Sequence, residues 1–130
     1  MAVGILLVTH PDIGDAHKRI AERLVGRPPL PLECFEVPFD ADLDALLPQA
    51  SACLRRLDQG DGVLVLTDLY GASPSNFAAR LGNLGIRTRR IAGLNLPMLL
   101  RALNYADREL DALADTAMGG GKLGVVIDHG

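Results

Sequence analysis

The sequence predicts an α/β fold: a single three-layer domain with a mainly parallel sheet of order 2-1-3-4 and helices on both faces. Three observations support this prediction. The chain has 130 residues, which suits one domain covering residues 1–130. Apolar residues make up 48% and charged residues 22%, as expected of a globular core. Short apolar runs also alternate along the chain with segments of helical periodicity, which is typical of βαβ units.

Apolar runs of about five or six residues predict buried strands of the parallel type. Val3–Val8 (VGILLV) and Val63–Thr67 (VLVLT) are the clearest of these runs. Leu32–Val37 (LECFEV) alternates between apolar and polar residues, and Thr88–Leu94 (TRRIAGL) is more polar. The last run, Leu123–Ile127 (LGVVI), is expected to form a C-terminal strand at the edge of the sheet.

Between these runs, apolar residues recur at helical spacing and are flanked by typical helix ends. Gly26 and the proline-rich residues 28–31 are expected to end the first helix, and Asp42 to cap the second. Pro74 suits the first turn of the third helix. The run Gly119–Gly121 is expected to break the last helix. The expected helices cover residues 15–25, 43–57, 74–81, 96–105 and 109–118.

Charge and cysteine content exclude several classes of function. The formal net charge is -3, aromatic residues make up 4%, and no basic run is present, so no nucleic-acid-binding surface is expected. Cys34 and Cys53 lack the spacing of a zinc or thioredoxin-like motif, so free thiols in a reducing compartment are expected. The apolar N-terminus is too short to span a membrane and lacks the features of a signal peptide, which indicates a cytoplasmic protein.

The polar residues after the first and third strands form the candidate site. In an open parallel sheet, ligands bind at the carboxyl ends of the strands, where the strand order reverses. With the order 2-1-3-4, this point lies between the first and third strands, so the loops after them face each other. These loops carry Thr9, His10 and Asp12 after the first strand, and Asp68, Gly71, Ser73 and Asn76 after the third.

His10 and Asp68 each follow a buried strand and form the candidate catalytic pair. A carboxylate beside one imidazole nitrogen fixes the tautomer and leaves the other nitrogen free as a nucleophile. Taken singly, each residue has an equally simple structural role, His10 as a hydrogen-bonded strand end and Asp68 as a capping carboxylate. Pro11 keeps His10 out of helical backbone angles, so a helix does not begin at once.

The segment Gly71–Asn76 is suited to binding an anion. Its small residues let backbone N–H groups approach a ligand, and a helix that begins at Pro74 adds the positive end of its dipole. Ser73 is expected at the N-cap, where its hydroxyl caps the helix or donates to a phosphoryl oxygen. The glycines before Lys122 are not a P-loop, because no strand precedes them and no Ser or Thr follows the lysine.

Three segments together carry a resemblance to a known family. They are Gly4–His10 (GILLVTH), Thr67–Asn76 (TDLYGASPSN) and Gly93–Leu99 (GLNLPML). In order and spacing they resemble the mannose-type enzyme IIA family of the bacterial phosphoenolpyruvate-dependent sugar phosphotransferase system (PTS). The matching family features are a first strand ending in a phosphorylated histidine, a D-x-x-G-G-S-P-x-N loop and a G-x-N-x-P-M-L segment. Pro11 and Ala72 depart from the family pattern, which usually has glycine at both positions.

The resemblance implies a phosphocarrier. His10 would accept a phosphoryl group from the phosphohistidine of the carrier HPr and pass it to a IIB partner, which serves the membrane components IIC and IID. Asp68 would orient His10 by a hydrogen bond. The implied phosphoryl-binding residues are Thr9, Gly71, Ala72, Ser73 and Asn76.

The resemblance also implies that neither a metal nor an organic cofactor takes part, because donor and acceptor are both phosphohistidines. It implies a homodimer in which the C-terminal strand crosses to the partner's sheet, with Gly119–Gly121 as the hinge. Because the sequence ends at Gly130 without a IIB domain, a free-standing IIA is expected.

Three alternatives stay open at the level of sequence. One is a IIA whose phosphorylation state is sensed by another protein without sugar uptake, which Pro11 and the missing IIB domain keep open. Another is the phosphocarrier subunit that serves dihydroxyacetone kinase, although the G-A-S-P-x-N loop favours the sugar system. The third is a module that binds a small anion without being phosphorylated. The sequence names no sugar, because a IIA component never touches it.

Overall fold

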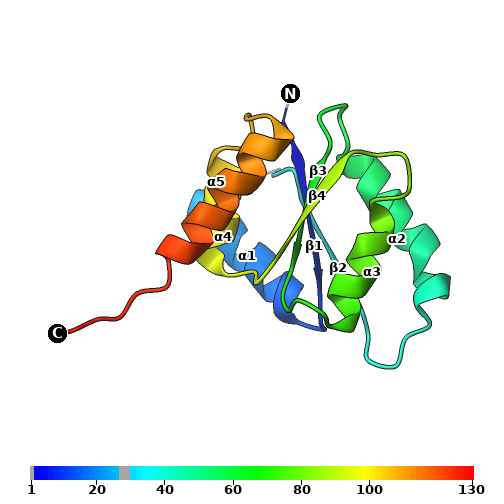
Figure 1. Cartoon of the computed structure of the whole chain (residues 1–130), viewed down its shortest axis with the longest axis horizontal. Helices are drawn as coiled ribbons and strands as arrows, with labels where there is room; N and C mark the ends of the chain where they lie inside the picture. The colour runs from blue at the N-terminus through cyan, green and yellow to red at the C-terminus, as the bar shows by residue number, and fades with distance from the viewer. Residues whose placement is uncertain (1, 27–29) are drawn as a thin grey trace.

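A four-stranded parallel sheet forms the centre of the fold. The computed structural model describes residues 2–26 and 30–130. Its strands follow the predicted order β2-β1-β3-β4 (Figure 1). They are β1 (Gly4–Thr9), β2 (Leu32–Glu36), β3 (Val63–Thr67) and β4 (Thr88–Ala92). Both β1 and β3 are buried along their whole length, which explains why their sequences are continuous apolar runs.

Helices cover both faces of the sheet, so the three predicted layers are present. In the described part of the chain they are α1 (Ile13–Val25), α2 (Leu43–Leu57), α3 (Ser73–Leu81), α4 (Leu96–Asn104) and α5 (Leu110–Leu123). Figure 1 shows α2 and α3 on one face and α1, α4 and α5 on the other. Along β1, Ile5 and Leu7 face the core with α1, α4 and α5. Leu6 and Val8 face the core with α2 and α3.

The ends of the first two helices agree with their sequence signals. Gly26 ends α1 with a φ of 68°, the left-handed conformation common in a C-terminal glycine. Asp42 caps α2 by accepting a hydrogen bond from the backbone N–H of Asp44 at 3.1 Å. The expectation that residues 28–31 help to end α1 concerns positions 28 and 29, which lie outside the described residues.

The predicted break at Gly119–Gly121 is wrong, because α5 continues through these glycines to Leu123. A Cβ atom at Gly120 would lie 2.7 Å from the Cβ of Arg101. One at Gly121 would lie 2.9 Å from the Cε of Met98. Glycine at these two buried positions lets α5 pack closely on α4, and this packing offsets the low helix propensity of glycine.

The three glycines differ in their surroundings, which gives a matched pair of stability predictions. Gly120→Ala is expected to lower the free energy of unfolding by about 1–3 kcal/mol, because its Cβ overlaps Arg101. Gly119→Ala is expected to raise it by up to ~1 kcal/mol, because nothing lies within 4 Å of the added Cβ. Urea unfolding of both variants measures the difference. Equal effects at the two positions would contradict the close packing of α4 and α5.

The strand predicted at Leu123–Ile127 is also absent from the single chain. Residues 125–130 have no regular secondary structure, and the side chains of Val125, Val126 and Ile127 are exposed by 77%, 75% and 78%. Figure 1 shows this C-terminal tail extending away from the end of α5. The physical reason is that a strand needs a neighbouring edge, and the tail does not lie along β4 of its own sheet.

Candidate active site

The candidate site lies at the carboxyl ends of β1 and β3. Val8 pairs with Thr67, so these strands end side by side, and His10 and Asp68 leave the sheet at the same edge. His10 Nδ1 lies 2.7 Å from Asp68 Oδ2, and the backbone N–H of His10 donates to the same oxygen at 3.0 Å. The side chains of His10 and Asp68 are 26% and 13% exposed, so the pair is shielded but accessible.

The charge of Asp68 determines which nitrogen of His10 is free. Partial burial acts to raise the pKa of Asp68. Hydrogen bonds from the backbone and ring of His10 outweigh this effect and hold the pKa below its ordinary value of 3.8. A charged carboxylate only accepts hydrogen bonds, so Nδ1 carries the proton between the two groups. In the neutral imidazole, Nε2 then holds the lone pair and is the nucleophilic atom.

Thr9 holds the loop after β1 in place. Its side chain is fully buried. Its hydroxyl donates to the carbonyl oxygen of His10 at 2.8 Å and accepts from the backbone N–H of Gly14 at 2.8 Å. Because this hydroxyl is buried and engaged twice, it fixes the backbone at His10, and the expected contact of Thr9 with a phosphoryl group stays a prediction.

The loop after β3 leads into the N-terminus of α3. Ala72 is the N-cap and Ser73 the first helical residue, so the expectation that Ser73 caps the helix is wrong. Asn76 closes the loop by donating its Nδ2 to the carbonyl oxygen of Gly71 at 3.1 Å. Gly71 has a φ of 85°, a conformation that favours glycine. In the described structure no side chain caps α3, which leaves its first N–H groups available to an anion.

A pocket of about 320 Å³ lies between these elements. It is lined by His10, residues 37–41, Leu43 and the first two residues of α3, Ser73 and Pro74. None of these described lining residues is a lysine or arginine. An anion in this pocket would therefore meet the N-terminus of α3 and the Ser73 hydroxyl, but no cationic side chain of the lining.

Phe39 is the neighbour of His10 that sequence reasoning missed. Its ring centroid lies 5.5 Å from that of His10, with the two planes tilted by 34°. The side chain of Phe39 is 73% exposed, although phenylalanine is a residue of protein interiors. An available signal was its place in the loop that follows β2, because β2 pairs with β1 and both strands end at the same edge.

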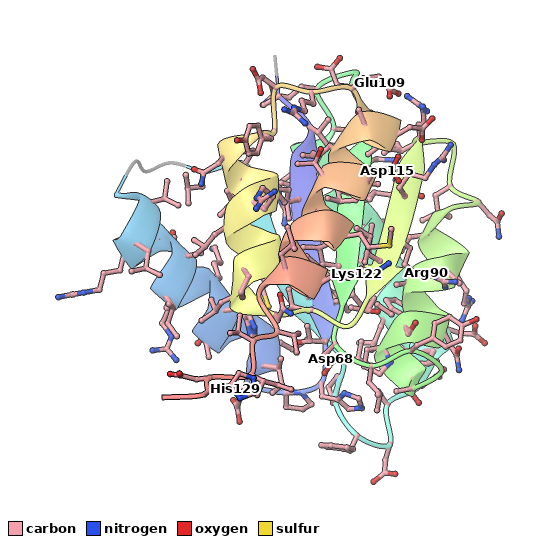
Figure 2. All side chains as sticks on the ribbon, turned by 60° about the vertical axis from the view of Figure 1, so that its left-hand side comes forward. Asp68, Arg90, Glu109, Asp115, Lys122 and His129 are labelled. Atoms are coloured by element: carbon pink, nitrogen blue, oxygen red, sulfur yellow. The ribbon has the colours of Figure 1, made fainter. Side chains whose placement is uncertain are left out.

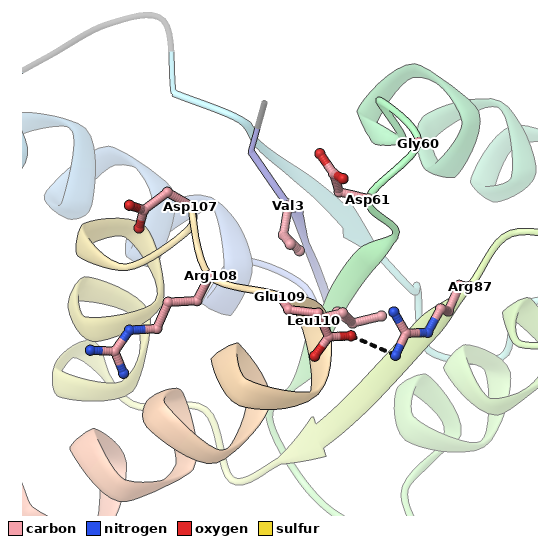
Figure 3. Close-up of a pocket in the computed structure, with 8 residues that line it drawn as sticks. All are labelled: Val3, Gly60, Asp61, Arg87, Asp107, Arg108, Glu109 and Leu110. Carbon is pink, nitrogen blue, oxygen red and sulfur yellow. Dashed lines mark ion pairs between the residues drawn. The ribbon is translucent and has the colours of Figure 1, made fainter.

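Another pocket, of about 370 Å³, lies at the amino ends of the strands. Figure 3 shows Arg87 and Glu109 in this pocket, joined by an ion pair of 2.7 Å. Figure 2 shows Glu109 and Asp68 at opposite ends of the molecule. Arg87 also pairs with Asp111 at 3.0 Å. This pocket is the weaker candidate, because these charges are neutralised within the chain and ligands of open sheets bind at the carboxyl ends.

The third segment of the family resemblance has a structural role. Asn95 caps α4 by accepting from the backbone N–H of Met98 at 2.9 Å. Its Nδ2 donates to the carbonyl oxygen of Gly121 at 3.0 Å. Asn95 therefore ties α4 to the glycine-rich part of α5.

The cysteines are free and half-buried. Burial, together with the nearby charges of Glu36 and Asp15, raises the pKa of Cys34 to about 12, so its thiol stays protonated and unreactive at neutral pH. Within residues 2–26 and 30–130, no group of three or more His, Cys, Asp and Glu side chains is placed to hold a metal ion.

Fold and site together define a class of protein: an α/β domain that presents a carboxylate-supported histidine at the switch point of its sheet, beside an uncapped helix N-terminus. Such an arrangement suits nucleophilic chemistry on an anionic group. The chain belongs to the EIIA-man family, whose model is described as "PTS system fructose IIA component" and matches residues 4–118.

Individual relatives agree with this assignment. The chain is 32% identical over 127 residues to the "PTS system mannose-specific EIIAB component" of Escherichia coli strain K12. The match covers 96% of this chain and 39% of that protein, so the chain spans about two-fifths of the length of this relative.

Solved structures share the fold. The mannose/sorbose-specific IIA subunit from Enterococcus faecalis has a TM-score of 0.87 at 24% identity, covering 100% of this chain and 98% of that chain. A PTS IIA protein associated with the fucose utilization operon of Streptococcus pneumoniae has a TM-score of 0.74 at 25% identity, covering 92% and 93%. In the part of the chain that the structure describes, no helix is both long and apolar enough to span a membrane.

Proposed function

We propose that this chain is a phosphocarrier of the phosphoenolpyruvate-dependent sugar PTS and that His10 carries the phosphoryl group on Nε2. The observation that carries the proposal is the hydrogen bond between His10 Nδ1 and Asp68 Oδ2 at 2.7 Å. This bond fixes the tautomer and leaves a lone pair on Nε2, at the switch point of the sheet. Membership of a PTS IIA family supports the same role.

The proposed transfer needs no movement of a proton. The Nε2 lone pair attacks the phosphorus of a donor phosphohistidine, and the donor's N–P bond breaks. The donor imidazole leaves with the electron pair of that bond and keeps the proton on its other nitrogen. His10 gains the Nε2–P bond and keeps its Nδ1 proton, so its ring becomes positively charged. Asp68 faces this charge and stabilises it until the phosphoryl group moves on.

In this proposal the loop after β3 holds the phosphoryl oxygens. The Ser73 hydroxyl and the first N–H groups of α3 are the donors, together with the backbone N–H of Gly71. The backbone N–H of Ala72, which donates to the carbonyl oxygen of Leu69 at 3.3 Å in this structure, would exchange that bond for one to the phosphoryl group. Asn76 acts indirectly in this proposal: its hydrogen bond to the carbonyl oxygen of Gly71 sets the shape of the loop that holds the phosphoryl oxygens.

The proposed donor is HPr, and the proposed acceptor is a IIB component that serves the membrane components IIC and IID. Each transfer breaks one N–P bond of a phosphohistidine and forms another on a histidine, so both are nearly balanced in free energy. Positioning and electrostatics therefore suffice, and we assign no metal or organic cofactor. With these partners, the chain would act in the cytoplasm, with residues 1–130 as one IIA domain.

The test is transfer of label from radiolabelled phosphoenolpyruvate through enzyme I and HPr to the purified chain. We expect acid-labile label that then moves to a IIB component. An unlabelled chain beside a competent control IIA would overturn the phosphocarrier role and favour an anion-binding module. Label that enters the chain but reaches no IIB component would favour a IIA read by a regulatory partner.

We also propose that the chain forms a homodimer by exchange of its C-terminal tail. Leu123, Val125, Val126 and Ile127 expose apolar side chains, with exposed fractions of 72–78%. Strand β4 lies at the edge of the sheet and has an unpaired side. A tail that pairs with β4 of a second copy would bury these side chains and cover that edge.

Truncation tests the exchange. A chain that ends at Gly124 is expected to sediment as a monomer, because it lacks the three residues that would pair with the second copy. A chain that ends at Ile127 loses only the polar end of the tail and is expected to stay dimeric. Analytical ultracentrifugation separates the two states. A dimer that survives truncation at Gly124 would contradict tail exchange.

A further inference from the structure

Phe39 stands on a loop that is held at both ends. Before it, the backbone N–H of Val37 donates to the carbonyl oxygen of Thr9 at 2.8 Å, next to His10. After it, Asp42 caps α2. Pro38 has a fixed φ, and Asp40 has a φ of 60°, which is rare for a residue with a side chain. These bonds and angles restrict the loop that carries Phe39 beside His10.

Burial in a core does not explain this position, because 73% of the Phe39 side chain is exposed. Its aromatic contact in the described structure is the ring of His10, at a centroid distance of 5.5 Å. This distance lies in the range of favourable aromatic pairs. It also lies within the ~6 Å over which an aromatic face attracts a cation.

We infer that Phe39 is a positioning residue for the phosphorylated form of His10, an inference that rests on the proposed function. With Nδ1 protonated and Nε2 phosphorylated, the imidazole ring is a cation. Asp68 would hold this ring through its Nδ1–H, and Phe39 would attract it through the negative face of its own ring. Phe39 also lines the pocket beside His10, where it occupies space that water would otherwise fill.

Two consequences follow for the phosphorylated chain. Phosphorylation of His10 is faster with the Phe39 ring than without it, because positive charge develops on the imidazole as the Nε2–P bond forms. Hydrolysis of the phosphohistidine is slower with the Phe39 ring, because the imidazole loses that charge when the Nε2–P bond breaks. In hydrolysis the oxygen of water bonds to phosphorus, the Nε2–P bond breaks with its electron pair returning to Nε2, and inorganic phosphate is released.

The experiment compares the wild type with Phe39→Ala, Phe39→Tyr and the control Tyr105→Ala. Tyr105 is an aromatic residue after α4, at the amino ends of the strands, where it is 39% exposed and packs on Arg108. Each chain is phosphorylated through HPr and freed of the donor, and the decay of its phosphohistidine is followed. The kcat and KM for transfer from phosphorylated HPr are measured separately. Because Phe39 is mostly exposed, its variants are expected to fold, and circular dichroism checks this.

We expect Phe39→Ala to decay about 3- to 10-fold faster and to lose kcat by a similar factor, with KM unchanged. Phe39→Tyr retains the ring and should match the wild type, and Tyr105→Ala should leave the decay unchanged. A raised KM with unchanged decay would mean that Phe39 only contacts the partner, which overturns the inference. Unchanged decay and kinetics would overturn it too. An unlabelled wild type would instead overturn the proposed function, and the inference with it.

Discussion

Replacing His10 with alanine is expected to abolish phosphorylation of the chain by HPr. The account places the new bond to phosphorus on Nε2 of His10, and no other group at the site offers an equivalent nitrogen. The label should fall below detection, a loss of at least about 10³-fold, as expected when a covalent nucleophile is removed. Label from radiolabelled phosphoenolpyruvate, relayed through enzyme I and HPr, measures this loss.

His17 provides the matched control for this variant. It lies on α1, where its Nδ1 is 2.9 Å from the carbonyl oxygen of Ile13 and the residue is half-buried. His17→Ala is therefore expected to be labelled like the wild type. Full labelling of His10→Ala, or loss of label in His17→Ala alone, would assign the phosphoryl group to another residue.

Asp68→Asn is expected to give the second largest effect, a decrease in kcat of roughly 10²–10⁴-fold. An asparagine removes the negative charge that faces the phosphorylated ring. Its amide can also donate to Nδ1, which moves the ring proton to Nε2 and blocks the nucleophile. Single-turnover transfer from phosphorylated HPr measures this effect directly.

The control for Asp68→Asn is an aspartate that pairs at the surface. Asp44 is 2.7 Å from Arg80, and its side chain is 84% exposed. Asp44→Asn should transfer at the wild-type rate, because an exposed ion pair contributes little and Asp44 is not among the residues that line the pocket beside His10. A rate for Asp68→Asn within about threefold of the wild type would show that the hydrogen bond to His10 is structural only.

The sheet could be predicted because its two central strands carry a strong local signal. The runs at β1 and β3 are apolar throughout, and only a strand buried on both faces accounts for that pattern. Failures occurred where tertiary packing overrides local preference. Gly120 favours a helix end by propensity, yet it lies inside α5. A glycine stands there because Arg101 leaves no room for a side chain where α5 packs on α4. The tail at Leu123–Ile127 has strand propensity, but it does not lie along the edge strand β4 of its own sheet and forms no strand there.

In the site, too, some features follow from local sequence signals and others depend on tertiary packing. The pairing of His10 with Asp68 could be anticipated, because parallel strands place their carboxyl ends at one edge. The engagement of Thr9 with Gly14 could not, since it depends on where α1 begins. Phe39 was missed although its loop follows the strand beside β1, because its contact with His10 depends on the path of that loop and not on any periodic pattern.

The central claim is that Nε2 of His10 carries the phosphoryl group, and identifying the phosphorylated nitrogen tests it most directly. NMR of the phosphorylated chain with isotope-labelled histidine rings identifies this atom from the coupling between phosphorus and ring nitrogen. The account predicts coupling to Nε2 of His10 and a proton retained on Nδ1, where Asp68 accepts it. Coupling to Nδ1 of His10, or to the ring of His17, would contradict the account.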